Sequence, residues 1–304
     1  MRIDTLTYHN VETQGARRRA WLREHSPQHL QQCAALVHSA LEKRPSGASQ
    51  GTLVLGAGAC TEIPLEELVR HSDEVALADL DLNSMKSAWE ELPSPALRRR
   101  VRLLECDLTG GVSTDLHRLL THQPWDVLIA QGARAVFDAA ASCLELCSVA
   151  DPPQLATLSA GEFGLVVSSL TLSQLFSYPL LDVLDYIQQL APSYLNEQEH
   201  HHRYQQAAQD FRARIIQAHL HLLRELLDTG GLAVLLSDIR GFAFNVSGTE
   251  HRRSIPLVPR VFPELVSGTF TVLQEAHWEW ITDLPAKDKF GRGYEVVGYV
   301  LNLP

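Results

Sequence analysis

The chain has 304 residues, of which 45% are hydrophobic and 20% charged, and a formal net charge of -10 at pH 7. This composition is typical of a folded globular protein and excludes a disordered chain, because enough apolar surface is present to offset chain entropy. The net acidic charge also argues against a dedicated nucleic-acid binder, which needs a cationic face. We therefore expect no nucleic-acid partner.

The sequence shows no clear pattern of a membrane helix, a secretion signal or a metal site. No apolar stretch approaches the roughly 20 residues of a membrane helix, so we expect no membrane partner. Residues Met1 to Asp4 carry no apolar signal segment. The five cysteines are an odd, dispersed set without metal-type spacing, which favours buried thiols in a reducing compartment and no metal site. The expected location is the cytoplasm.

The first 50 residues look mostly helical and polar. Ser26-Pro27 has the N-cap and first-turn pattern of a helix start, and apolar residues recur behind it at helical spacing. A loop at 45–49 closes this region. We expect a helical N-terminal lid at 1–50 and a second unit at 51–304.

From residue 52 onward, short apolar runs alternate with helical patterns, which is typical of a parallel sheet with crossover helices. Residues 125–130 fit a strand or a helix start, and we prefer the helix. The predicted strands are 52–55, 74–79, 101–105, 163–169, 232–238, part of 270–280, and 294–301. The main predicted helices are 83–92, an Ala-rich one ending near 147, 180–190, and 199–227 with a stop at Gly230-Gly231.

A glycine-containing loop follows the first of these strands. Gly56 and Gly58 allow a sharp turn and close approach of a ligand, and the next helix start offers free N–H groups. Taken alone this pattern is weak, since strand-Gly-x-Gly turns are common in α/β folds.

Acidic residues follow the second and third strands. Asp79 ends the second strand, where a carboxylate can accept hydrogen bonds from ribose hydroxyls. Asp81 is the rival candidate, but we expect it to cap the next helix instead. Asp107 follows the third strand and either contacts an adenine amine or caps the strand end. Because the carboxyl ends of neighbouring parallel strands form one crevice, these signals converge on one ligand site.

Five successive segments resemble the motifs of class I S-adenosylmethionine-dependent methyltransferases. They are VLGAGACTEIPLEEL, VALADLD, LLECDLTG, FGLVVSSLTLSQL and LLDTGGLAVLLSDI, within about residues 50–240. The resemblance implies a doubly wound, mostly parallel seven-stranded sheet, a Rossmann-like α/β fold with an antiparallel C-terminal strand. It implies S-adenosylmethionine as the cofactor, bound by Gly56, Ala57, Gly58, Asp79, Leu80, Asp107, Leu108, Ser168 and Ser169.

The chain departs from that family at three positions. Val54 stands where an acidic residue is common, Cys60 replaces the third glycine, and Gly164 replaces an Asp at the fourth strand's entry. The Asn-Pro-Pro-Tyr type of motif is absent, since Ser168 to Thr171 occupy its place. These departures leave the subfamily open.

Methyl transfer needs alignment of the acceptor and exclusion of water more than a catalytic motif, so no catalytic residue is assigned. The acceptor is expected to be a small molecule or a peptide. Three consecutive His residues at 200–202 are expected to be a solvated helix start, and Trp278 and Trp280 to be core or interface. Candidate acceptor-site residues, chosen by their place after the fourth and fifth strands or in the lid, are Tyr8, Thr171, Gln174, Tyr178, Asp238 and Arg240.

Three alternatives remain open at this point. A nicotinamide-dependent Rossmann oxidoreductase would need Gly or Ala where Thr61 stands, and a second mononucleotide half that the pattern lacks. A non-catalytic nucleoside-binding protein of the same fold is a further option. Aminopropyl transfer from a decarboxylated cofactor would use extra acids near the glycine loop, with Glu62 as a candidate.

Overall fold

The computed structural model describes residues 20–245, 253–286 and 289–304. Its centre is a sheet of eight strands, seven of them in the order β3-β2-β1-β4-β5-β8-β7 and the eighth, β6, paired to β5. The parallel strands are β1 (Gly51–Leu55), β2 (Glu74–Asp79), β3 (Val101–Glu105), β4 (Phe163–Ser169) and β5 (Leu227–Phe244). The antiparallel strands are β6 (Arg253–Pro256), β7 (Thr271–Asp283) and β8 (Gly291–Asn302).

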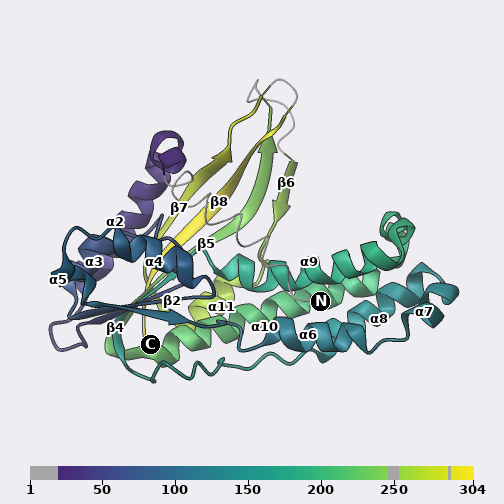
Figure 1. Ribbon diagram of the computed structural model, residues 1–304, viewed down its shortest axis with the longest axis horizontal. Coiled ribbons are helices and arrows are strands. Elements are labelled where there is room, and N and C mark those ends of the chain that lie inside the picture. The colour runs from purple at the N-terminus through teal and green to yellow at the C-terminus, as the bar shows by residue number, and fades with distance from the viewer. Residues whose placement is uncertain (1–19, 246–252, 287–288) are drawn as a thin grey trace.

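Helices cover both faces of this sheet, so the predicted doubly wound, mostly parallel fold with an antiparallel C-terminal strand is confirmed (Figure 1). One face carries α2 (Pro27–Lys43), α3 (Leu65–His71), α4 (Leu82–Glu90) and α5 (Pro95–Arg98). The other carries α6 (Val112–Thr121), α7 (Trp125–Gln131), α8 (Ala133–Leu146), α9 (Leu172–Leu190), α10 (His202–Leu226) and α11 (Phe262–Thr269). Two short 3-10 turns, Pro192–Asn196 and Gln198–His200, join α9 to α10.

Alternating side chains of the strands build two separate cores. In β4, Val166 points to the face of α6–α11 and Val167 to the face of α2–α4, and both are fully buried. Strands of a parallel sheet form nearly continuous apolar runs in sequence, because helices cover both of its faces. This is why β1, β2, β3 and β4 were predicted within a residue of their bounds.

The described part of the expected N-terminal lid is helical at 20–25 and in α2. Pro27 is in the first turn as expected, but the Ser26 side chain does not cap the helix. Its hydroxyl donates to the Ile281 carbonyl at 2.6 Å and so fastens the start of α2 to β7. That residues 1–50 act as a lid stays a prediction, since residues 1–19 lie outside the described part.

The long helix ends at Leu226, within a residue of its predicted end at 227, and the chain enters β5 at once. Gly230-Gly231 lies inside β5 and does not end the helix, and two further expectations about the later elements were wrong. β5 has 18 residues instead of seven, because it continues past the parallel strands to pair with β6 and β8. The sheet has eight strands instead of seven, since the sequence pattern contains no sign of the four-residue β6.

The extended strands form an arm that rises from the sheet, while α9 and α10 run out in another direction (Figure 1). The arm consists of the end of β5, β6, and the paired ends of β7 and β8. No helix among the described residues is long and apolar enough to cross a membrane.

Candidate functional site

The loop after β1 is held against the end of β2 by its own backbone. The N–H groups of Gly56 and Ala57 both donate to the Ala78 carbonyl, at 2.9 and 3.2 Å. Gly56 has φ +66° and Gly58 has φ +46°, a region that disfavours side chains. A Cβ at Gly56 would lie 2.3 Å from the Cβ of Thr171, so glycine is what allows the start of α9 to approach this loop.

Asp79 ties this loop to the end of β2. Its Oδ2 accepts a hydrogen bond from the Gly58 N–H at 2.9 Å, and its Oδ1 accepts one from the Asp81 N–H at 2.9 Å. Burial raises the pKa of the Asp79 carboxyl, and the backbone N–H donors oppose that rise only in part. Each carboxylate oxygen retains acceptor capacity for a further donor, such as a hydroxyl.

The two residues after Asp79 have separate roles. Asp81 caps α4, since its carboxylate accepts hydrogen bonds from the backbone N–H groups of Asn83 and Ser84. This is the alternative that the sequence favoured for Asp81. Leu80 is 54% exposed although it is apolar, and it follows Asp79 directly in the chain.

Asp107 is engaged within its own loop. Its Oδ1 accepts from the N–H and the hydroxyl of Thr109, at 2.8 and 2.7 Å, and its Oδ2 accepts from the Gly111 N–H at 2.9 Å. The side chain thus stabilises the turn into α6, as a strand-end cap does. Leu108 is 5% exposed and its side chain packs in the core. The adenine-contacting role of this pair stays a prediction.

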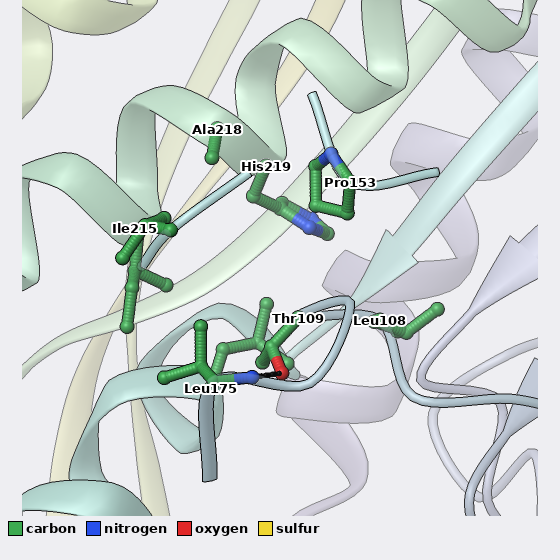
Figure 2. A pocket seen from close by; sticks show the side chains of 9 residues that line it. Leu108, Thr109, Pro153, Leu175, Ile215, Ala218 and His219 are labelled. Carbon is green, nitrogen blue, oxygen red and sulfur yellow. Dashed lines mark hydrogen bonds between the residues drawn. The ribbon is translucent and has the colours of Figure 1, made fainter. Parts of the chain in front are cut away.

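Ser168 is fully buried in β4 and pairs with a histidine that the sequence analysis did not single out. Its hydroxyl and His219 Nε2, on α10, form a hydrogen bond of 2.8 Å. Burial lowers the pKa of His219 to about 4, and its Nδ1 has no partner among the described residues. His219 lines a cavity of about 10 Å³. Figure 2 shows its ring extending from α10, with Thr109 and Leu175 opposite. The Ser168 hydroxyl is thus bonded within the core, and its contact with the cofactor stays a prediction.

The chain turns sharply just after the end of β4, toward the glycine loop. Leu170 has φ +50° and donates its N–H to the Leu236 carbonyl of β5 at 3.1 Å. Ser169 and Thr171 on either side of it are 7% exposed. Thr171 is thereby brought against Gly56, which places this predicted acceptor residue beside the predicted cofactor loop.

Asp238 lies inside β5, two residues beyond Leu236, the last β5 residue that pairs with β4, and it is 8% exposed. The Ser173 hydroxyl, in the first turn of α9, lies near this carboxylate, and Oδ1 has no partner among the described residues. Burial raises the pKa of this carboxyl, and the nearby Ser173 hydroxyl opposes the rise. A buried carboxylate with an unused oxygen is costly and is typical of functional sites.

The remaining predicted acceptor residues do not join this group. The Gln174 side chain is exposed and donates to the Leu170 carbonyl at 3.2 Å, and Tyr178 is 55% exposed on α9. The guanidinium of Arg240 pairs with Glu295 at 3.2 Å on the arm. Tyr8 lies outside the described residues. For these four the acceptor role stays a prediction.

His201, Trp278 and Trp280 pack against aromatic or histidine rings of other elements. His201 lies at the start of α10, and its ring centroid is 3.7 Å from that of Phe137. Trp278 and Trp280 are buried against His29 of α2, with Trp278 Nε1 donating to His29 Nδ1 at 2.8 Å. The expectation that both tryptophans belong to the core is confirmed. No group of three or more metal-ligating side chains is found in the described residues.

Two of these site residues escaped the sequence analysis for different reasons. Ser173 is two residues after Thr171 in a serine- and threonine-rich turn, and only its contact with Asp238 distinguishes it. His219 could have been noticed as a lone histidine among the apolar residues that α10 turns to the core. That signal more often marks a satisfied core residue than a site.

No family model and no curated protein matches this sequence. Among solved structures, the chain is similar to an S-adenosylmethionine-dependent methyltransferase from Aquifex aeolicus, at 11% identity over 88% of this chain and 89% of that one, with a TM-score of 0.38. The glycopeptide N-methyltransferase MtfA, complexed with S-adenosylmethionine, matches at 13% identity over 86% and 92%, with a TM-score of 0.38. The MccD protein matches at 7% identity over 89% and 96%, with a TM-score of 0.42.

All three TM-scores lie below 0.5. The fold rests on the strand order of this chain. Five parallel strands, followed by the inserted antiparallel β8 and the edge strand β7, form the doubly wound, mostly parallel sheet that the sequence predicted.

Proposed function

We propose that this protein transfers a methyl group from S-adenosylmethionine to a small-molecule or peptide acceptor. The observation that carries the proposal is the Asp79 carboxylate at the end of β2, fixed 2.9 Å from the Gly58 N–H at the glycine loop. In open α/β sheets, ligands bind in the crevice at the carboxyl ends of the strands, and an acid in this position accepts ribose hydroxyls.

The residues present fit a nucleoside cofactor. No cation of the described chain lies close enough to Asp79 to lower its pKa, so its remaining acceptor capacity is open to hydroxyl donors. The exposed Leu80 offers an apolar surface for one face of a base. Asp107 is the weaker part of the fit, because three hydrogen bonds already occupy its carboxylate.

When bound, the cofactor supplies a methyl group already activated by the positive sulfur. The tasks left to the chain are holding the acceptor in line and excluding water. Thr171 lies against Gly56, and Ser173, two residues further along the chain, lies near Asp238. An acceptor between these groups would border the glycine loop on one side and β5 on the other.

The sheet argues against a nicotinamide oxidoreductase. A dinucleotide fold has two mononucleotide halves of parallel strands. Here β5 is followed in the sheet by the antiparallel β8 and β7, and Thr61 occupies the position of the third glycine. The second half is therefore missing from the described residues.

Calorimetry with S-adenosylhomocysteine and with NAD tests the cofactor assignment. We expect saturable binding of S-adenosylhomocysteine and none of NAD. Incubation with tritiated S-adenosylmethionine and fractionated cell extract should then label an acceptor that mass spectrometry identifies. Cofactor binding without any labelled product would favour the non-catalytic nucleoside-binding protein, and binding of NAD alone would refute the proposal.

A further inference from the structure

We propose that the small cavity between α10 and the turn before α6 is a binding site for one water molecule, held by His219 Nδ1 and the Thr109 hydroxyl. The inference concerns the interior of the fold and does not depend on the methyl transfer proposed above. It assigns a ligand that joins α10 to the turn between β3 and α6.

The imidazole ring of His219 is fixed at one nitrogen and open at the other. Its Nε2 and the Ser168 hydroxyl form a hydrogen bond of 2.8 Å. Ser168 is fully buried and His219 is 1% exposed, so bulk solvent does not reach this pair. The second ring nitrogen, Nδ1, has no partner among the described residues. A buried polar atom without a partner is costly, so this nitrogen favours a ligand with which it can form a hydrogen bond.

The cavity beside this ring has the size of a single water molecule. His219 and Thr109 both line it, and its volume is about 10 Å³. A cavity of about 10–15 Å³ is enough to hold one water. Figure 2 shows the His219 ring extending from α10 on one side and Thr109 with Leu175 on the opposite side. The volume therefore excludes a metabolite or a second nucleoside as the ligand.

Thr109 supplies the second polar group of the site. Its hydroxyl donates to Asp107 Oδ1 at 2.7 Å and accepts from the Val112 N–H at 3.2 Å. Because a hydroxyl oxygen has two lone pairs, one of them is left for a further donor. Thr109 is 9% exposed, so that donor must come from within the cavity. A buried water takes two to four polar partners, and His219 with Thr109 meets the lower number.

The chemistry of the lining favours a neutral ligand. Apart from His219 and Thr109, every lining side chain is apolar, from Leu108 on the turn to Ala218 on α10. Burial lowers the pKa of His219 to about 4, so the ring is uncharged at neutral pH. An ion in these surroundings would lack any compensating charge.

Water also matches the ring in either neutral form. A neutral imidazole has one donor nitrogen and one acceptor nitrogen, and which of them is Nδ1 depends on the direction of the bond to Ser168. A water molecule both donates and accepts, so it completes Nδ1 in both cases. It can at the same time donate to the spare lone pair of Thr109.

Crystal structures of the wild type and of His219→Leu test for this water directly. In the wild type we expect one density peak in the cavity, within about 2.7–3.2 Å of both His219 Nδ1 and Thr109 Oγ1. In His219→Leu the peak should disappear, because one of its two polar partners is gone. A wild-type cavity without density, or a protein group bonded to Nδ1, overturns the proposal even if His219→Leu does not fold.

Water-selective NMR gives the same reading in solution, with a matched pair of methyl groups on α10. Ile215 lines the cavity, whereas its neighbour Ile216 is fully buried and does not. With labelled isoleucine methyl groups, we expect a nuclear Overhauser effect from water at Ile215 and none at Ile216, and its loss in His219→Leu. Equal signals at the two methyl groups, or a signal at Ile215 that persists in His219→Leu, contradict the site.

Discussion

Two turns of the chain depend on glycine for separable physical reasons. At Gly56, between β1 and α3, the backbone has φ +66°, and a Cβ would also meet the Thr171 side chain at 2.3 Å. At Gly111, before α6, the backbone has φ +104°, and an added Cβ would meet no atom within 4 Å. Substitutions at these two glycines therefore distinguish the cost of backbone strain from the cost of a steric collision.

Gly111→Ala should cost about 1 kcal/mol of unfolding free energy, from backbone strain alone. Gly56→Ala should cost about 1–3 kcal/mol more, because Thr171 and the start of α9 must move. Chemical denaturation measures both. Equal losses in the two variants would show that Thr171 does not press on the glycine loop.

His219 makes the stability of the fold depend on pH. Its folded-state pKa of about 4 lies below the usual value for histidine of about 6.5, so the folded state binds fewer protons than the unfolded chain between these values. Its contribution is complete above a pH of about 6.5 and is lost as the pH falls toward about 4. The loss should reach about 3 kcal/mol.

His219→Gln removes the titrating ring and should flatten this part of the stability curve. Urea unfolding at pH values of about 7, 5.5 and 4.5 measures the difference between variant and wild type. Parallel curves for the two proteins would show that His219 is not the group responsible.

At the scale of elements, a glycine on β8 allows α2 to pack closely against the sheet. A Cβ at Gly298 would lie 2.3 Å from Cδ1 of Leu36 and 2.9 Å from the Trp278 ring. Leu36 is 1% exposed and belongs to the core on that face. The helix therefore approaches the sheet as closely as it does because position 298 has no side chain.

Gly298→Ala should destabilise the fold by about 1–3 kcal/mol through overpacking, and Leu36→Ala by about 2–5 kcal/mol through a cavity. The double variant should lose less than the sum, since each change makes room for the other. Denaturant unfolding of the four proteins completes the cycle. Strict additivity would place Leu36 and Gly298 out of contact.

Most elements were predictable because their residues repeat at a regular period. β1, β2 and β4 are short runs buried on both faces, and α7 and α8 were distinguished from a strand by an Ala-rich pattern that extends beyond Ile129. β6 and the far half of β5 were missed, because they pair with each other outside the main core. Short strands that pair outside the core need little apolar periodicity, so the sequence pattern does not reveal them.

At the scale of the whole molecule, the sequence predicted where the site lies but only part of what its residues do. Strand ends with Gly56, Asp79 and Asp107 mark the carboxyl edge, because every parallel strand ends there. Two features depend on which residues lie nearby in space. They are the hydrogen bonds of Asp107 within its own loop and the unpaired oxygen of Asp238. Such contacts cannot be read from spacing alone.

The most direct test of the account is calorimetric binding of S-adenosylhomocysteine to the wild type, Asp79→Ala and Asp81→Ala. Because Asp79 is assigned to the ribose, its variant should lose about 1–3 kcal/mol of binding free energy. Asp81 caps α4, so its variant should lose about 1 kcal/mol of stability but keep the wild-type affinity. Unchanged affinity in Asp79→Ala, or an equal loss in Asp81→Ala, would contradict the assignment.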